Sequence, residues 1–343
     1  MSLNEKLTVS ASPHVRSPET TTGIMLDVII SLIPALAASV WLFGPRTLLV
    51  TATTVLSCML SEFFSRKIMK RQGTLGDLSA IVTGILLAFN LPATIPLWVA
   101  AIGSVVAIVV VKQFFGGIGQ NFVNPALVGR IVLMASFPTM MSTWVQPFAW
   151  RGVQVVTTAS PLASISSMFT AGDVSAAATA SNPALPSLWQ MLIGQRQGSL
   201  GEVCALALLL GFAYLLIRRV ITPVIPLTYI GTVAVIMLIA GKGSLSFVAY
   251  EILGGGLLLG AIFMATDYTT SPINFKGKLI YGVGCGILTA LIRLFGSLPE
   301  GVSFSIIIMN ILVPHIERLT TPKPFGSAKT PKKKQSRKKE AGA

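Results

Sequence analysis

Long apolar runs separated by short polar turns dominate the chain. A helix needs about 20 mostly apolar residues to cross the hydrocarbon core of a bilayer. Ten candidate stretches can be read along the sequence: 26–43, 47–65, 79–92, 94–111, 121–136, 200–217, 224–241, 246–265, 277–296 and 301–316. The stretch 79–92 is short, so it is expected to be a half-helix rather than a full crossing. The pattern predicts an all-α polytopic membrane protein with about ten transmembrane helices.

The ten stretches fall into two sets of five, with a long loop between them. The predicted organisation is a cytoplasmic N-terminal segment at 1–25, a first five-helix repeat at 26–136, an extracytoplasmic loop at 137–199, a second repeat at 200–316 and a basic cytoplasmic tail at 317–343. Because five is an odd number, two related halves would face opposite ways across the membrane. Inverted repeats of this kind place ligands near the midplane, beside interrupted helices.

Composition and charge support this interpretation and give it an orientation. Hydrophobic residues make up 52% of the chain and charged residues only 11%, with a net charge of +14. Lysine and arginine concentrate at both ends of the chain and in the even-numbered loops, which are those after the second, fourth, sixth and eighth stretches. Because cationic loops stay on the cytoplasmic side, this pattern predicts that both termini are cytoplasmic. Half of the net charge lies in 317–343. A lysine-rich tail beside a last span fixes topology and touches anionic lipid, so the predicted partner is lipid and not nucleic acid.

The sequence offers no metal site and no complete redox machinery. Cys58, Cys204 and Cys285 lie in separate apolar stretches, and His14 and His315 are isolated. Neither a Gly-rich nucleotide loop nor a cysteine cluster for iron–sulfur binding is evident. We therefore expect no catalytic residues and no complete activity from this chain alone.

Arg130 lies inside the fifth stretch. Because burying a charge in the membrane costs free energy, a charged residue at such a position is a candidate functional residue. Its guanidinium could hold a phosphate, a flavin carbonyl or a buried carboxylate. The alternative is a structural arginine that snorkels or contacts another subunit. Asn124 and Pro125 open the same helix, and its free N–H groups are expected to point toward an anionic ligand.

A second polar group stands at the end of the eighth stretch. Asp267 is followed by Thr269, Thr270 and Ser271, and it lies opposite Asn90 if the two halves are related. This cluster is a candidate ligand site at the cytoplasmic end. The alternative is a helix C-terminus that is satisfied by the turn after it.

The outer loop carries the run Thr157-Thr158-Ala159-Ser160-Pro161-Leu162-Ala163. From composition alone, this is an ordinary hydroxyl-rich turn stiffened by proline. The neighbouring Trp150 and Trp189 suggest that the ends of the loop rest at headgroup level.

Several blocks, in this order, resemble one known family: the RnfD component of Rnf complexes and its relative, the NqrB component of the sodium-pumping NADH:quinone reductase. The blocks are Ser12-Pro13-His14, Met25-Leu26-Asp27-Val28, Asn124-Pro125-Ala126-Leu127-Val128-Gly129-Arg130, Thr157 to Ala163, Gly254-Gly255-Gly256, and Phe263-Met264-Ala265-Thr266-Asp267. The length of the chain favours RnfD.

The resemblance implies a flavin-carrying subunit in a bacterial or archaeal cytoplasmic membrane. Rnf complexes pass electrons between ferredoxin and NAD⁺ and couple this to Na⁺ or H⁺ movement. Their RnfD component holds FMN by a phosphodiester to an outer-loop hydroxyl, installed by a flavin transferase. Ser160 matches the modified position, with Thr157 and Thr158 as alternatives. The implied partners are the iron–sulfur, NADH- and ferredoxin-facing subunits and the small membrane subunits.

Relatives also hold a second, noncovalent flavin, riboflavin or another FMN, near the cytoplasmic side. The polar groups singled out above, Asn90, Asn124, Arg130, Asp267 and Thr269, are the candidate residues for binding it. Two positions depart from the attachment motif: Thr158 replaces a common Gly, and Gln154 replaces an Asp. A channel or secondary transporter for a small solute remains the alternative function. An assembly subunit without flavin is a third, if Gln154 prevents attachment.

Overall fold

The computed structural model describes residues 19–151, 161–170, 185–296 and 300–322. Within these ranges the chain is helical and forms no strand. The helices of the first half are α1 (Thr21–Phe43), α2 (Arg46–Ile68), η1 (Leu75–Asp77), α3 (Ser79–Phe89), α4 (Leu97–Val105), the π-helix η2 (Val106–Gln113) and α5 (Pro125–Ser136). Those of the loop are α6 (Pro138–Met141), η3 (Ala149–Arg151), α7 (Pro161–Thr170) and α9 (Leu188–Ile193). The second half contains α10 (Ala205–Ile217), α11 (Val224–Ala240), α12 (Leu245–Leu253), α13 (Leu257–Leu259), the π-helix η4 (Gly260–Met264), α14 (Phe275–Phe295) and α15 (Val302–Thr320).

The lengths and surfaces of these helices are those of a multi-pass membrane protein. In the described ranges, α1, α2, α14 and α15 are long and apolar enough to cross a bilayer, and α12 with α13 and η4 forms one further, bent pair. Five other apolar helices are shorter, at 10–17 residues. Only 22% of the most apolar window of α1 is buried, although its mean hydropathy is 2.1. An outward apolar surface of this extent is typical of a helix that contacts lipid or another membrane subunit.

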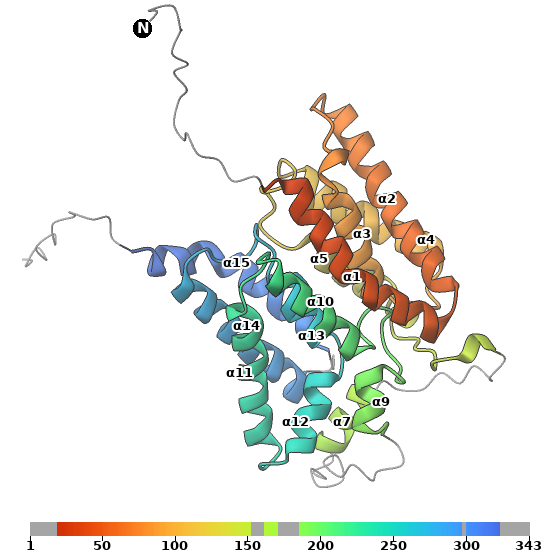
Figure 1. Cartoon of the computed structure of the whole chain (residues 1–343), viewed down its shortest axis with the longest axis vertical. Helices are drawn as coiled ribbons and strands as arrows, with labels where there is room; N and C mark the ends of the chain where they lie inside the picture. The colour runs from red at the N-terminus through yellow and green to blue at the C-terminus, as the bar shows by residue number, and fades with distance from the viewer. Residues whose placement is uncertain (1–18, 152–160, 171–184, 297–299, 323–343) are drawn as a thin grey trace, which may run out of the picture.

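The helices form two neighbouring groups. Figure 1 shows α1 to α5, red to yellow, on one side and α10 to α15, green to blue, on the other. In the first group α2 packs on α3 and α4, and in the second α14 packs on α11 and α15. The groups meet where α1 lies along α10 and where α5 packs against α15.

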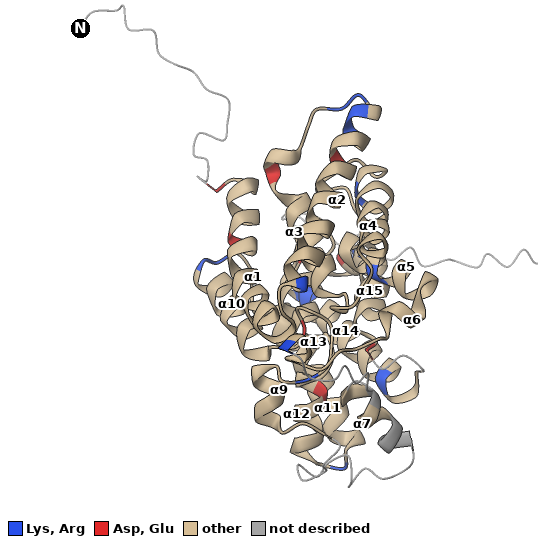
Figure 2. Cartoon of the chain, turned by 90° about the vertical axis from the view of Figure 1, so that its right-hand side faces the viewer, with Lys and Arg blue, Asp and Glu red and all other residues tan. Residues whose placement is uncertain are grey.

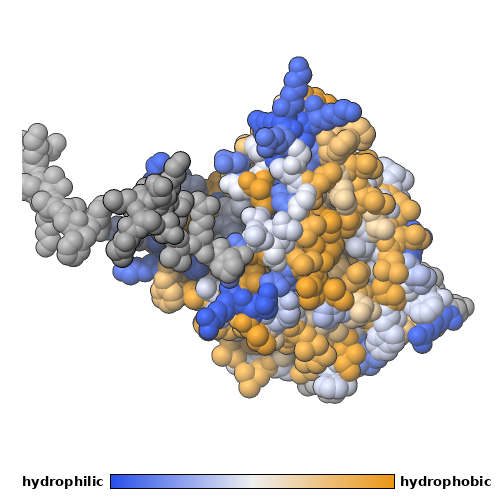
Figure 3. Space-filling model, turned by 45° about the horizontal axis from the view of Figure 1, so that its top comes forward, coloured by the Kyte–Doolittle hydropathy of each residue, from blue (hydrophilic) through white to orange (hydrophobic). Residues whose placement is uncertain are grey.

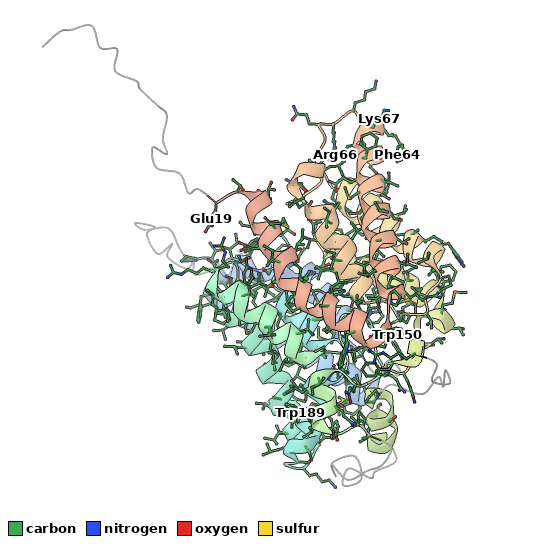
Figure 4. All side chains as sticks on the ribbon, turned by 45° about the vertical axis from the view of Figure 1, so that its right-hand side comes forward. Glu19, Phe64, Arg66, Lys67, Trp150 and Trp189 are labelled. Atoms are coloured by element: carbon green, nitrogen blue, oxygen red, sulfur yellow. The ribbon has the colours of Figure 1, made fainter. Side chains whose placement is uncertain are left out.

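Charged and apolar residues are distributed as a membrane requires. In Figure 2 most cations lie toward the edges of the helical body, while a few charged residues lie in its middle. Figure 3 shows an apolar flank with hydrophilic residues gathered in separate patches. In Figure 4, Arg66 and Lys67 project from one end, and Trp150 and Trp189 lie toward the other.

Each predicted stretch overlaps a helix, but several boundaries differ for local reasons. Helix α1 begins at Thr21, inside the segment predicted as polar, because the Thr20 side chain accepts a hydrogen bond from the Gly23 N–H at 3.1 Å. Helix α5 begins at Pro125 rather than at 121, because Asn124 caps it. The eighth stretch bends by 66° between α12 and α13, where Gly255 adopts a φ of +60°.

Close helix contacts in the first half depend on small residues. A Cβ atom on Gly84 of α3 would lie 2.7 Å from the Cα atom of Val55 in α2. A larger residue at position 84 would prevent the two helices from approaching this closely. In lipid, close packing is a principal force between helices.

We therefore predict that Gly84→Ala destabilises the protein, although alanine favours helices. Overpacking against the α2 backbone should cost about 1–3 kcal/mol. The measurement is the thermal midpoint of the detergent-solubilised protein. Gly231→Ala on α11 is the control, because a Cβ atom there meets no other atom within 4 Å. Equal midpoints for the two variants would contradict the prediction.

Candidate functional site

Arg130 is the centre of a buried polar network between the two helix groups. It is 2% exposed. Its Nη1 atom donates to Asn90 Oδ1 at 2.7 Å, to Glu202 Oε1 at 3.0 Å and to Ser303 Oγ at 3.2 Å. Its Nη2 atom donates to Glu300. Helices α3, α5 and α15 and the segment before α10 thus converge on one guanidinium group.

Two further arginines occupy the break between α12 and α13. Arg293 of α14 forms an ion pair with Glu251 at 3.0 Å and donates to the carbonyl oxygens of Glu251 and Gly254 at 2.5 and 3.3 Å. Arg196 donates to the carbonyl of Gly255 at 3.5 Å and to that of Glu202 at 2.6 Å. Carbonyls that the break frees from helical bonding therefore accept from guanidinium groups rather than from water.

The end of α3 is completed by the segment that precedes α10. The backbone N–H groups of Leu200 and Gly201 donate to the carbonyls of Leu91 and Phe89, both at 3.0 Å. A Cβ atom on Gly201 would lie 2.2 Å from the Phe89 ring, so only glycine permits this approach. This contact also positions Glu202 against Arg130. We call the side chains of Asn90, Arg130, Arg196, Glu202, Glu251, Arg293, Glu300 and Ser303 the central network.

A separate cavity of about 370 Å³ lies between the helix groups, at the N-terminal end of α5. Its walls are mostly apolar side chains from both halves, with a smaller set of polar groups among them. The polar lining residues are Thr21, Ser79, Thr83, Lys112, Asn121, Asn124, Thr266, Asp267 and Thr269. An apolar hollow with a few convergent polar groups is typical of a small-molecule site.

Asp267 is held by the turn after it. Its carboxylate accepts hydrogen bonds from the Thr269 hydroxyl at 3.0 Å, the Thr269 N–H at 3.4 Å and the Thr270 hydroxyl at 3.3 Å. Burial raises the pKa of Asp267, and the hydrogen bonds from Thr269 and Thr270 oppose that rise. The carboxyl group of Asp267 lines the cavity. Its protonation state therefore depends on the hydrogen bonds that Thr269 and Thr270 donate to it.

The N-terminus of α5 corrects one expectation. Its N–H groups were predicted to be free for an anion, but Asn124 Oδ1 accepts from the N–H of Ala126 at 3.0 Å and of Leu127 at 3.4 Å. The Asn124 amide nitrogen donates to the Met264 carbonyl at 3.3 Å. Asn124 thus caps one half of the protein and binds the other, and the helix terminus is already satisfied.

The structure separates the predicted site residues into two places. Asn124, Asp267 and Thr269 line the cavity. Asn90 and Arg130 contact each other in the central network and do not line the cavity. Arg130 pairs with the carboxylates of Glu202 and Glu300, and a buried carboxylate is one of the partners considered for it.

The candidate attachment residues Thr157, Thr158 and Ser160 lie outside the described residues. The helix after them, α7, begins at Pro161. Leu162 of α7 is buried and lies against the break, where Cβ atoms on Gly254 and Gly255 would come within 3.3 and 3.1 Å of it.

Sequence reasoning missed the acidic half of the central network and a buried pair in the first half. Glu202 and Glu300 stand at the starts of apolar stretches, and neither is among the predicted site residues. Lys112 and Glu62 each lie at the end of a predicted stretch, yet Lys112 Nζ lies 2.9 Å from Glu62 Oε2 with both side chains buried. The available signal was that each of these charges directly adjoins an apolar run. Among the described residues, no group of three or more His, Cys, Asp or Glu side chains could hold a metal ion.

Comparison with known proteins confirms the resemblance inferred from the motifs. The model of the NQR2, RnfD, RnfE family matches residues 8–326. The chain is 45% identical over 332 residues to the D subunit of the Na⁺-translocating ferredoxin:NAD⁺ oxidoreductase complex of Acetobacterium woodii, covering 96% of this chain and 99% of that protein. It is 40% identical to the D subunit of the proton-translocating ferredoxin:NAD⁺ oxidoreductase complex of Clostridium ljungdahlii, covering 93% and 96%. It is 32% identical to the D subunit of the ion-translocating oxidoreductase complex of Escherichia coli, covering 94% and 99%.

We predict that Arg130→Met lowers the free energy of unfolding by about 3–5 kcal/mol, because it leaves Glu202 and Glu300 as buried charges without a cationic partner. The thermal midpoint in detergent measures this. Arg218→Met is the matched control, since Arg218 also pairs with a carboxylate, that of Asp27, but its side chain is 58% exposed. A midpoint for Arg130→Met as high as that of the control would refute the structural role of Arg130.

Proposed function

Because the chain belongs to the NQR2, RnfD, RnfE family, we propose that it is the flavin-carrying membrane subunit of an ion-translocating ferredoxin:NAD⁺ oxidoreductase. The observation that carries the proposal is the similarity, over 93% or more of both chains, to the D subunits of two complexes that carry this name. The coupling ions named for those two relatives differ, being Na⁺ in one and H⁺ in the other. The proposal therefore includes ion translocation without assigning the ion.

The proposed topology has ten spans in two inverted five-helix repeats, with both termini in the cytoplasm. Two observations support it. The cationic end with Arg66 and Lys67 lies opposite the end with Trp150 and Trp189 (Figure 4). The second half also contains a helix that bends between α12 and α13, and α3 of the first half is short, with 11 residues. The proposed boundaries of the membrane repeats remain 26–136 and 200–316, with the loop 137–199 outside.

The proposed outer cofactor is FMN, attached through a phosphodiester to Ser160. The support is the motif that ends in this hydroxyl, together with the packing of α7 immediately after it. Because Leu162 lies against the α12–α13 break, a group attached two residues earlier would be held close to the membrane domain. A flavin transferase is the partner that this attachment requires.

The proposed inner cofactor is a noncovalent riboflavin or second FMN in the cavity. The residues present fit such a group: apolar walls suit a flat ring system, and Asn121, Thr266 and Thr269 offer polar groups around it. A bound flavin supplies one- and two-electron transfer there. Val82, Leu86 and Phe263 would exclude water from the ring, and Asp267 can hold or release a proton at its carboxylate. Electrons would then pass between an outer and an inner flavin.

The proposed partners are the subunits that hold the redox groups and nucleotide sites absent from this chain. They are the iron–sulfur subunits, the NADH- and ferredoxin-facing subunits and the small membrane subunits of an Rnf complex. The relatives' names describe subunits of such complexes. Anionic lipid is the proposed partner of the basic tail.

A secondary transporter of similar architecture is the alternative, and the helix break argues against it. In transporters, carbonyls at an interrupted helix coordinate the transported cation. Here Arg196 and Arg293 donate to the carbonyls of Glu251, Gly254 and Gly255. Fixed positive charge therefore stands where a cation would bind. A transporter would also be active in vesicles containing this chain alone, which the redox proposal does not require.

We predict a fluorescent band when the chain is expressed with a flavin transferase, purified and run on a denaturing gel. Ser160→Ala should abolish the fluorescence, and Ser160→Thr should retain it, because either hydroxyl can accept the phosphoryl group. Mass analysis of the loop peptide should locate FMN on Ser160. A dark wild-type band, despite a transferase that modifies a known substrate, would favour the assembly-subunit alternative that Gln154 raises.

We predict that Thr266→Trp removes a second flavin that is released when the complex is denatured. The indole would fill part of the cavity that Thr266 lines. Chromatography of the released flavin quantifies this, and the covalent FMN should be unchanged. Thr321→Trp is the control, because Thr321 is exposed and does not line the cavity. Equal amounts of released flavin from both variants would place the second flavin elsewhere.

A further inference from the structure

Lys112 and Glu62 form a buried pair that the proposed function has not used. Lys112 is 3% exposed and Glu62 is fully buried. Lys112 Nζ lies 2.9 Å from Glu62 Oε2 and donates to Ser79 Oγ at 2.6 Å. Thr74 Oγ1 donates to the other carboxylate oxygen of Glu62 at 2.5 Å. These hydrogen bonds hold the ammonium group of Lys112 between Glu62 of α2 and Ser79 of α3.

The pair stands between two hollows. On one side, Glu62 and Thr74 lie in the wall of a surface pocket of about 450 Å³, which also includes Arg66, Lys67 and Arg71. On the other side, Lys112 and Ser79 line the cavity proposed for the inner flavin. The hydrogen bonds from Thr74 through Glu62 and Lys112 to Ser79 thus run continuously from the surface pocket to the cavity.

We propose that Glu62 and Lys112 form the path by which protons from the cytoplasm reach the group bound in the cavity. This inference rests on the proposed function, because it needs an occupant that takes up protons when it is reduced. The electron comes from a reduced iron–sulfur or flavin carrier in a partner subunit. Lys112 would break one Nζ–H bond and give that proton to the reduced group. The neutral amine would then take a proton from Glu62, and Glu62 would regain one through the Thr74 hydroxyl from water in the surface pocket, which leaves hydroxide to the bulk solvent, so that one electron and one proton enter together.

The choice of side chain supports proton transfer. Arginine keeps its proton under all ordinary conditions, whereas lysine can release one when buried. The central network uses Arg130, Arg196 and Arg293, which hold charge in place. The cation at the cavity wall is instead Lys112, which can alternate between ammonium and amine.

The pair is unsuited to binding a metal cation. The ammonium of Lys112, 2.9 Å from Glu62, already neutralises the carboxylate and would repel a second cation. Among the described residues, no group of three or more His, Cys, Asp or Glu residues could hold a metal ion.

Charged groups lie on both sides of the pair. Arg66, Lys67 and Arg71 line the surface pocket together with Glu62. Asp77 accepts from the Ser79 hydroxyl at 2.5 Å, Cys58 lies on α2 about one turn before Glu62, and Asp267 lines the same cavity as Lys112. Cations thus gather on the pocket side of Glu62, and Lys112 is the cation that lines the cavity.

The test uses the whole purified complex with its flavins bound, in weakly buffered solution with a pH-indicator dye. After rapid reduction, the rate of proton uptake is recorded together with the flavin absorbance. Lys112→Arg keeps the charge but cannot release its proton, and Glu62→Gln removes the acceptor. We expect each to slow proton uptake by about 100-fold or more, the scale of a positioned acid–base group. Thr74→Val, which keeps the pair itself, extends the test if Glu62→Gln fails to fold, with a smaller slowing expected.

Asp27→Asn is the matched control, because Asp27 is also a carboxylate paired with a cation, Arg218, but does not line the cavity. It should take up protons at the wild-type rate. Wild-type rates in both Lys112→Arg and Glu62→Gln, with the inner flavin still bound, would overturn the proton path. Absence of any releasable flavin from the wild-type complex would instead refute the inner flavin itself, so the two failures are distinguishable.

Discussion

The rest of the structure depends on the hydrogen bonds and ion pairs that the guanidinium group of Arg130 makes. A charge inside a membrane protein is tolerated only when its surroundings replace the hydration it has lost. Arg130 meets this condition by drawing Asn90, Glu202, Glu300 and Ser303 to one point. These partners come from both helix groups and from the segment between them. The cost of burying one charge is thus offset only when the two halves and their connection are assembled together.

The same constraint explains the contacts at the end of α3 and at the break after α12. Inside a membrane, irregular backbone must find partners within the protein. The end of α3 is completed by the N–H groups of Leu200 and Gly201, and the break after α12 by Arg196 and Arg293. Backbone N–H groups thus satisfy the carbonyls at the end of α3, and arginine side chains satisfy those at the break after α12. The two halves can therefore share an arrangement of helices while differing in the electrostatic character of these two places, and the positive one lies beside α7.

Much of the fold could be predicted from the sequence, because apolar runs and their flanking charges are local signals. Each predicted stretch overlaps a helix, and the cluster of Asp267 and Thr269 lines a cavity with Asn124, as its position suggested. The pairing of charges could not be predicted, because it depends on contacts between distant segments. Arg130 meets Glu202, 72 residues away, and Glu300, 170 residues away. Asn90 was assigned to the same site as Asp267 by its place in the half, yet its side chain turns to Arg130. Whether Ser160 carries FMN depends on a transferase as well as on this chain, and it stays a prediction.

The two π-helical segments, η2 and η4, have a consequence for how this protein can change. Each contributes to the cavity, through Lys112 and Phe263 respectively. In a π-helix the N–H bonds to the carbonyl five residues back, as Phe114 does to Val109 and Ala265 to Gly260, so each turn holds an extra residue. Loss of one residue from such a segment would restore α-helical spacing and rotate the remainder of the helix by about 100°. The composition of the cavity wall is therefore encoded in helix length as well as in residue identity. A one-residue deletion within η2 would move Lys112 off the wall, so the span count would be kept while the chemistry of the cavity is lost.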